Sequence, residues 1–227
     1  MLIYAHRGAS ADFPEHSQVA YEAAVKQGAD GFECDIRLTQ DREIICWHDS
    51  NTKRNSSKNL IISQSTFAEL EFAQPLKFSW LLDFAISQGK NLAIETKHPV
   101  STGGAIEVEI LKLLKTREED IRASGIWITI MSFSVRAVQR VKKSPFERVF
   151  LIERPLFLQD NPAQILGPGI HLVRKNPHIV KQIHKEGKKV FVWTVNDDDD
   201  VRFCNDLGVD VIMSDKPGQA RAALRYS

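Results

Sequence analysis

Residues 31–38 read Gly31-Phe32-Glu33-Cys34-Asp35-Ile36-Arg37-Leu38. This run predicts a buried strand that carries two carboxylates. Side chains two positions apart on a strand point to the same face, so Glu33 and Asp35 share one face while Cys34 points to the other. The surrounding apolar residues indicate that both faces of the strand are covered, and a carboxylate in such a place needs a partner.

Short apolar runs of this kind alternate with longer amphipathic stretches, a pattern typical of βα units around a parallel sheet. Strands are predicted at residues 2–5, 31–38, 43–47, 91–95, 126–131, 148–152, 169–173, 190–195 and 209–213. Helices are predicted at residues 17–27, 79–88, 105–115, 135–142, 177–186, 198–207 and 218–225. Asn196, which four aspartates follow, is the predicted N-cap of the helix at 198–207.

The number of strands favours a closed barrel. If residues 43–47 are a hairpin partner of residues 31–38, eight strands remain, and eight βα units at about this chain length fit a (β/α)₈ TIM barrel of the α/β class. An open doubly wound sheet is the alternative, because counting strands does not establish closure. We expect residues 1–227 to form a single domain, since neither a linker nor an internal repeat divides the sequence.

The segment 49–78 breaks the alternation of strands and helices. Residues 49–59 are polar and rich in turn-forming residues, and residues 60–76 show no clear period. Connections of this length are uncommon in compact domains and usually have a function. We therefore expect a small insertion or lid after the second strand, over one mouth of the barrel.

Composition excludes several classes of protein. The 227 residues are 43% hydrophobic and 26% charged, and the formal net charge is +1, far from the basic surplus of a nucleic-acid-binding protein. No apolar run approaches the roughly 20 residues that span a membrane. The three cysteines suggest buried thiols rather than disulfides, and the amino terminus has no secretory pattern, so we expect a cytoplasmic protein.

Three carboxylates lie where predicted parallel strands should meet. Glu33 and Asp35 belong to one strand, and Glu95 closes the next barrel strand along the chain. Carboxylates packed together repel unless a cation or a proton intervenes. An all-oxygen set suits Mg²⁺ or Ca²⁺, with Mn²⁺ as a further candidate. A solvated strand end or an ion-pair network is the alternative interpretation.

Basic side chains accompany these carboxylates at the predicted strand ends. His6 and Arg7 follow the first strand, His48 follows residues 43–47, and Lys97 follows Glu95. Each histidine alone is weak evidence of catalysis. As a set with a metal, these groups suit a phosphate ester, because the cations neutralise its oxygens while two imidazoles divide the proton transfers.

An ordered series of short motifs resembles the glycerophosphodiester phosphodiesterase family and spans nearly the whole chain. The motifs are Ala5-His6-Arg7-Gly8, Pro14-Glu15, Gly31-Phe32-Glu33-Cys34-Asp35-Ile36, Trp47-His48-Asp49, Ala93-Ile94-Glu95-Thr96-Lys97, Val192-Trp193-Thr194-Val195-Asn196 and Gly208-Val209-Asp210.

The resemblance implies a (β/α)₈ barrel that uses a divalent cation to hydrolyse small-molecule glycerophosphodiesters to sn-glycerol 3-phosphate and an alcohol. It implies an acid–base pair, three metal ligands, two residues that hold the phosphate, an acidic residue near the metal or the glycerol, and an aromatic residue that packs against the substrate. By matching motif, the acid–base pair is His6 and His48, and the metal ligands are Glu33, Asp35 and Glu95. The residues that hold the phosphate are Arg7 and Lys97, the acidic residue is Glu15, and the aromatic residue is Trp193.

The chain departs from the family pattern after Glu15. His16 and Ser17 stand where the family has Asn and Thr. We expect Ser17 to cap the next helix and the side-chain contact of the Asn to be lost.

Two other functions are alternatives to the glycerophosphodiesterase activity. The first is a lysophospholipase D that acts on lysophospholipids, which a wide apolar mouth around Phe133, Phe157 and Trp193 would favour. A non-catalytic barrel that binds phosphate esters is the third candidate function. The nucleophile is either water or the substrate's 2-hydroxyl, and the sequence leaves a monomer or a homodimer equally open.

Overall fold

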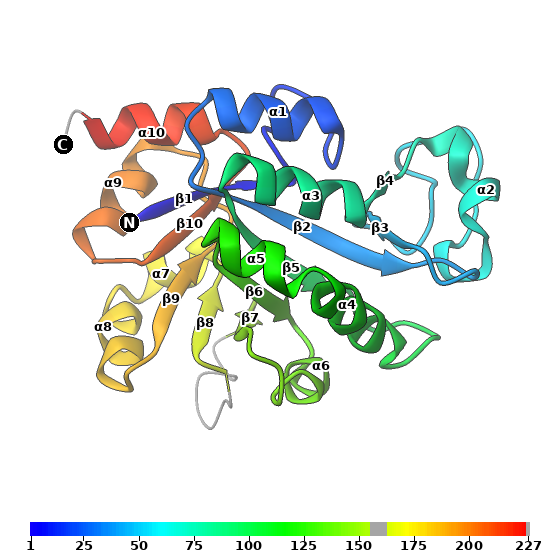
Figure 1. Cartoon of the computed structure of the whole chain (residues 1–227). Helices are drawn as coiled ribbons and strands as arrows, with labels where there is room; N and C mark the ends of the chain where they lie inside the picture. The colour runs from blue at the N-terminus through cyan, green and yellow to red at the C-terminus, as the bar shows by residue number, and fades with distance from the viewer. Residues whose placement is uncertain (155–162, 226–227) are drawn as a thin grey trace.

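The computed structural model describes residues 1–154 and 163–225. In these residues eight parallel strands form a closed ring, because β1 pairs with both β10 and β2. Helices surround the ring (Figure 1), as predicted for the (β/α)₈ barrel. The barrel strands are β1 (Leu2–His6), β2 (Gly31–Leu38), β5 (Asn91–Thr96), β6 (Ile128–Ser132), β7 (Glu147–Ile152), β8 (Ile165–Pro168), β9 (Lys189–Val192) and β10 (Val211–Ser214).

Among the described residues, helices lie on the outside of the barrel between most of its successive strands. Ser17 caps the first of them as expected, with its hydroxyl accepting a hydrogen bond from the backbone N–H of Ala20. The helices are α1 (Gln18–Lys26), α3 (Phe78–Gln88), α4 (Ala105–Thr116), α5 (Glu118–Ser124), α6 (Val135–Arg140), α7 (Ile170–Lys175), α8 (His178–Lys185), α9 (Asp198–Asp206) and α10 (Pro217–Arg225).

The expected hairpin partner of β2 is present as β3 (Ile44–Cys46), which pairs antiparallel with β2 and with the short β4 (Leu76–Lys77). Between β3 and β4 the chain leaves the barrel and forms the lobe at the right of Figure 1, with η1 (Ile62–Gln64), α2 (Phe67–Leu70) and η2 (Glu71–Ala73). A buried cluster of Ile45, Trp47, Ile62 and Leu70 supports it. No hydrophobic period is visible in this part of the sequence because these elements are only three or four residues long.

The structure corrects two local predictions near the end of the barrel. The seventh predicted strand, at residues 169–173, is wrong: the strand is β8 (Ile165–Pro168), and most of the predicted range lies in helix α7. The N-cap of α9 is Asp197 rather than Asn196. The amide of Asn196 instead donates to Asp215 and accepts from the Ser214 hydroxyl, which joins two loops at the mouth of the barrel.

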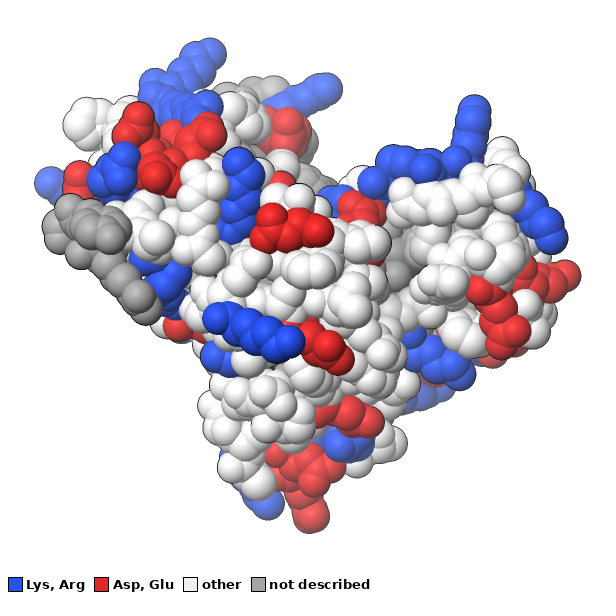
Figure 2. Space-filling view, turned by 90° about the horizontal axis from the view of Figure 1, so that it is seen from above, with Lys and Arg blue, Asp and Glu red and all other residues white. Residues whose placement is uncertain are grey.

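The thiols agree with the expectation from composition. Cys34, Cys46 and Cys204 are buried and free. Acidic and basic side chains are interspersed over the face seen in Figure 2, with no broad area of one sign. Among the described residues, no helix combines the length and the apolar character required to cross a bilayer.

Candidate active site

An acidic cluster lies at the carboxyl ends of two neighbouring strands. Glu33 and Asp35 come from β2, and Glu95 comes from β5 directly opposite Asp35 in the strand register. One oxygen from each of the three carboxylates lies within 4.8 Å of the others, and all three residues are buried. The pleat and the register thus place the three predicted ligands together.

The pKa values of the three carboxylates in this cluster are shifted in different directions. Burial, followed by the repulsion of Asp35, raises the pKa of Glu33 well above its usual range and that of Glu95 to about 7. Burial also acts to raise the pKa of Asp35, but a hydrogen bond with His16 and the charges of Lys97 and Arg7 outweigh it and hold that pKa low. A further cation here would relieve the repulsion.

The two predicted phosphate-binding residues both contact the cluster. Lys97 Nζ lies 2.7 Å from Asp35 Oδ1 and 2.9 Å from Glu95 Oε1, and Arg7 Nε lies 2.9 Å from Asp35 Oδ2. Arg7 has a left-handed backbone, with a φ of 61°, and it precedes Gly8, where a Cβ would lie 2.7 Å from Ala20. The tight turn after β1 therefore aims the guanidinium across the barrel mouth.

The residues present fit a divalent cation. Asp35 Oδ1 is buried and has no hydrogen-bond partner of good geometry, although Lys97 lies within ion-pair distance. The carboxylates of Glu33, Asp35 and Glu95 form a hard, all-oxygen donor set of the kind that Mg²⁺ and Ca²⁺ prefer. Such a set can hold a metal without the thiolate or imidazole ligands of a structural zinc site.

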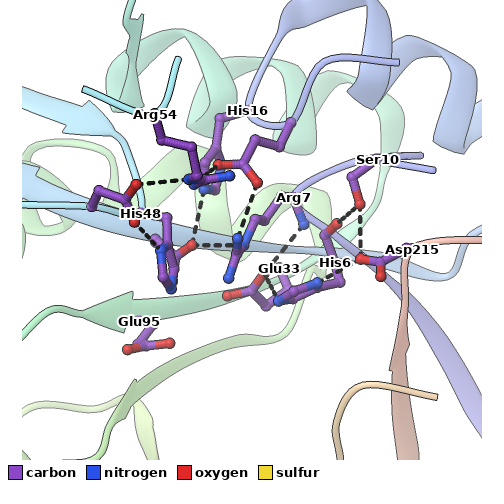
Figure 3. Close-up of polar contacts among 12 residues, drawn as sticks. His6, Arg7, Ser10, His16, Glu33, His48, Arg54, Glu95 and Asp215 are labelled. Atoms are coloured by element: carbon purple, nitrogen blue, oxygen red, sulfur yellow. Dashed lines mark hydrogen bonds and ion pairs between the residues drawn. The ribbon is translucent and has the colours of Figure 1, made fainter. Parts of the chain in front are cut away.

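His6 is anchored by a carboxylate from the other end of the chain. Its Nδ1 lies 2.7 Å from Asp215 Oδ1, which also accepts a hydrogen bond from Ser10 Oγ (Figure 3). Asp215 Oδ2 accepts a further hydrogen bond from Asn196 Nδ2. Burial raises the pKa of Asp215, but the hydrogen bond and charge of His6 outweigh it and leave that pKa low. His6 Nε2 consequently faces the acidic cluster, 3.8 Å from Glu33 Oε2.

His48 is held in a comparable way. Its Nδ1 lies 2.7 Å from Asp49 Oδ1, and its backbone carbonyl accepts two hydrogen bonds from Arg37. Burial lowers the pKa of His48, and the charges of Lys97 and Arg7 add to this against the pull of Asp35. Figure 3 shows His48 and His6 on opposite sides of the group, with Arg7 and Glu33 between them.

Most of the predicted site residues line one hollow of about 130 Å³. Its polar lining includes both histidines, two of the three proposed metal ligands and both phosphate-binding candidates, namely His6, His48, Glu33, Glu95, Arg7 and Lys97. Trp193 lines it as well and stacks edge to face with Phe133, with ring centroids 5.3 Å apart. Phe157 lies outside the described residues.

Glu15 does not line this hollow. It lies behind Arg7, to which it is joined by a 3.0 Å ion pair, and it also pairs with Arg54 of the inserted lobe. Burial raises the pKa of Glu15, but its bonds to Arg54 and Arg7 lower it to about 2. Glu15 therefore holds Arg7 in place and ties the lobe to the barrel.

His16 makes side-chain contacts of its own at the position where the family has asparagine. It is buried, and its Nε2 and Nδ1 lie 3.0 Å from Asp35 Oδ2 and from the Tyr21 hydroxyl respectively. Its φ of 57° is left-handed, a conformation in which Asn, Asp and His are all enriched. The left-handed backbone therefore allows the His16 side chain to contact Asp35.

Sequence reasoning missed Asp215 and the roles of Asp49 and Arg37. Asp215 directly follows the last strand, so a carboxylate at that strand end was a usable signal. Asp49 stands next to His48 in the sequence, but adjacency alone does not show which side chains bond. The contact of Arg37 with the His48 carbonyl depends on the antiparallel pairing of β2 and β3.

Comparisons with known proteins agree with the geometry. The profile of the glycerophosphoryl diester phosphodiesterase family matches residues 6–219. A Mycobacterium tuberculosis protein named "Probable glycerophosphodiester phosphodiesterase 1" is 33% identical, over 98% of this chain and 92% of its own. A glycerophosphodiester phosphodiesterase from Bacillus subtilis is 28% identical, over 96% of this chain and 84% of its own.

Solved structures show the same fold. A phosphodiesterase from Oleispira antarctica, in complex with the product sn-glycerol-3-phosphate, has a TM-score of 0.80 at 21% identity and covers 99% of this chain and 97% of its own. A glycerophosphodiester phosphodiesterase from Thermotoga maritima has the same TM-score at 19% identity, with 100% and 98% covered. The chain therefore belongs to the glycerophosphoryl diester phosphodiesterase family and is a phosphoric diester hydrolase.

Proposed function

We propose that the enzyme hydrolyses glycerophosphodiesters to sn-glycerol 3-phosphate and an alcohol, with one divalent cation, Mg²⁺ or Ca²⁺, held by Glu33, Asp35 and Glu95. The observation that carries the proposal is the single hollow in which two carboxylate-anchored histidines flank the acidic cluster. The cation, when bound, would polarise the phosphate and neutralise developing negative charge.

The residues of the chain divide the remaining work. Arg7 and Lys97 line the hollow and would hold the non-bridging oxygens of the phosphate, because a guanidinium and an ammonium both donate to them. His6 and His48 each use Nδ1 to bind a carboxylate, which leaves Nε2 for proton transfer. One imidazole would take a proton from the nucleophile while the other gives one to the departing alkoxide.

The dimensions of the hollow favour a glycerol moiety over an acylated one. At about 130 Å³, with Trp193 and Phe133 on one wall, the space beside the acidic cluster suits a glycerol phosphate. A lysophospholipid would have to place an acyl chain next to the same glycerol. We therefore retain lysophospholipids only as a comparison substrate in the test.

The test replaces His6 and His48 individually with Ala and measures release of sn-glycerol 3-phosphate from glycerophosphocholine. We expect each variant to lose roughly 10²-fold or more in kcat, the usual contribution of general acid–base catalysis. EDTA should abolish wild-type activity and Mg²⁺ or Ca²⁺ should restore it. The exposed His178, replaced by Ala, is the matched control. Near-full activity in both active-site variants would contradict the proposal.

A further inference from the structure

A second, larger hollow adjoins the first on the side of the inserted lobe. It measures about 710 Å³ and shares His48, Glu95, Lys97 and Phe133 with the smaller one. A substrate phosphate held at these shared residues would extend one arm into each hollow. The glycerol arm, common to every substrate of the proposed activity, suits the smaller hollow, so the alcohol arm would lie in the larger.

The larger hollow presents an arginine without an acidic partner. Arg37 lines it, and two of the N–H groups of its guanidinium are taken by the carbonyl of His48. A guanidinium has five such donors. No carboxylate within the described residues lies at ion-pair distance from Arg37. Burial lowers its pKa, against the more distant pull of Asp35, Glu95 and Asp49.

The other charges around this hollow do not offset Arg37. Arg54 is paired with Asp49 and Glu15, and Lys97 is paired with Asp35 and Glu95, so these acids are already occupied.

His98 Nε2 lies 2.6 Å from the buried Glu107, which leaves that carboxylate facing the histidine rather than the hollow. Lys53, on the inserted lobe, is exposed and has no ion pair with any described residue. The uncompensated charge of the hollow is therefore positive, from the partly buried Arg37 and the exposed Lys53.

We propose that this hollow binds the departing alcohol of the substrate and selects alcohols that carry an anionic group of their own, such as a phosphate monoester. The inference rests on the proposed function and adds a substrate class to it. The free donors of Arg37 would bind the second anion, with Lys53 completing the contact. The positive charge of a choline alcohol would lie against these same cations and be disfavoured.

The test compares three glycerophosphodiesters at saturating free Mg²⁺: glycerophosphoinositol, glycerophosphoinositol 4-phosphate and glycerophosphocholine. The first two differ only by a phosphate on the alcohol. We expect the wild type to favour the phosphorylated substrate roughly tenfold in kcat/KM, as for one charge-assisted hydrogen bond. Glycerophosphocholine should have the lowest kcat/KM of the three substrates, and added salt should reduce the differences in kcat/KM among them.

The variants are judged by the ratio of the two inositol substrates, because damage to His48 through Arg37 would lower both rates alike. Arg37→Gln should bring the ratio near one, and Lys53→Gln should lower it less. Arg122→Gln, an exposed change on α5, should leave it unaltered. Equal kcat/KM values for all substrates in the wild type, or an unchanged ratio in both hollow variants, would overturn the inference. Failure to hydrolyse any substrate would overturn the proposed function as well.

Discussion

Replacing Asp215 with Asn tests how the chain orients His6. Both oxygens of the Asp215 carboxylate are engaged. Oδ1 accepts a hydrogen bond from Ser10 and lies 2.7 Å from His6 Nδ1, and Oδ2 accepts a hydrogen bond from Asn196. An amide offers one accepting oxygen, so its NH₂ group must face a donor on one side. Asn196 cannot turn to compensate, because its own oxygen accepts from the Asp215 backbone and from Ser214.

The expected loss follows from the His6 contact. A hydrogen bond to a charged group contributes about 1.5–3 kcal/mol, and the lower half applies because the Asp215 side chain is 29% exposed. About 1.5–2 kcal/mol corresponds to a fall of roughly 10- to 30-fold in kcat/KM. Metal affinity should not change, since Asp215 does not belong to the acidic cluster.

The assay is steady-state hydrolysis of glycerophosphocholine with Mg²⁺, alongside metal titration by calorimetry and unfolding in urea. The matched control is Asp206→Asn, the same chemical change at the exposed carboxyl end of α9. A loss in kcat/KM of less than threefold would refute the orienting role. A comparable loss in metal affinity would instead show that Asp215 acts through the acidic cluster.

Three further predictions concern neighbouring residues. Glu95→Gln should weaken Mg²⁺ binding by roughly tenfold or more, measured by calorimetry, because one charged ligand is lost; equal affinity would remove Glu95 from the proposed ligands. The pKa of Glu15 is lowered to about 2 in the folded protein, so its stabilising effect is complete above its ordinary pKa of 4.5 and declines as pH falls towards 2. The difference in urea unfolding free energy between wild type and Glu15→Gln should therefore shrink as pH falls through this range. A difference that stays constant with pH would refute this prediction. His16→Asn should keep most of the activity while His16→Leu, which leaves Asp35 without its partner, should lose metal affinity; equal affinity in both would show that the contact with Asp35 is unimportant.

Much of the site could be predicted because parallel strands bring their carboxyl ends together. The positions of Glu33, Asp35 and Glu95 follow from alternation along β2 and from the pairing of β2 with β5. His6 and His48 needed only the location of their strand ends. Their carboxylate partners depend on loop geometry, and Asp215 is separated from His6 by 209 positions, a distance that no local pattern spans.

The misplaced seventh strand has a packing explanation. Gly167 and Pro168 discourage a strand prediction, whereas the run after Gly169 looks favourable. A Cβ at Gly167 would lie 2.8 Å from Leu151 Cδ2, so a larger residue would force the Leu151 side chain to shift in the barrel interior. Its carbonyl also accepts the hydrogen bond of the Trp193 indole, which sets that ring at the mouth. Tertiary packing therefore overrides the local preference at β8.

The pairing of β1 with both β2 and β10 has a consequence for truncated chains. His6 ends the first barrel strand, but the carboxylate that contacts it follows the last barrel strand. Arg221 of α10 in turn binds the Gly28 carbonyl and Asp30, just before β2. A chain that lacks β10 and the residues after it therefore holds Glu33, Asp35, Glu95 and both histidines without the carboxylate that contacts His6. We therefore expect turnover to depend on the final βα unit of the barrel, which brings Asp215 to His6.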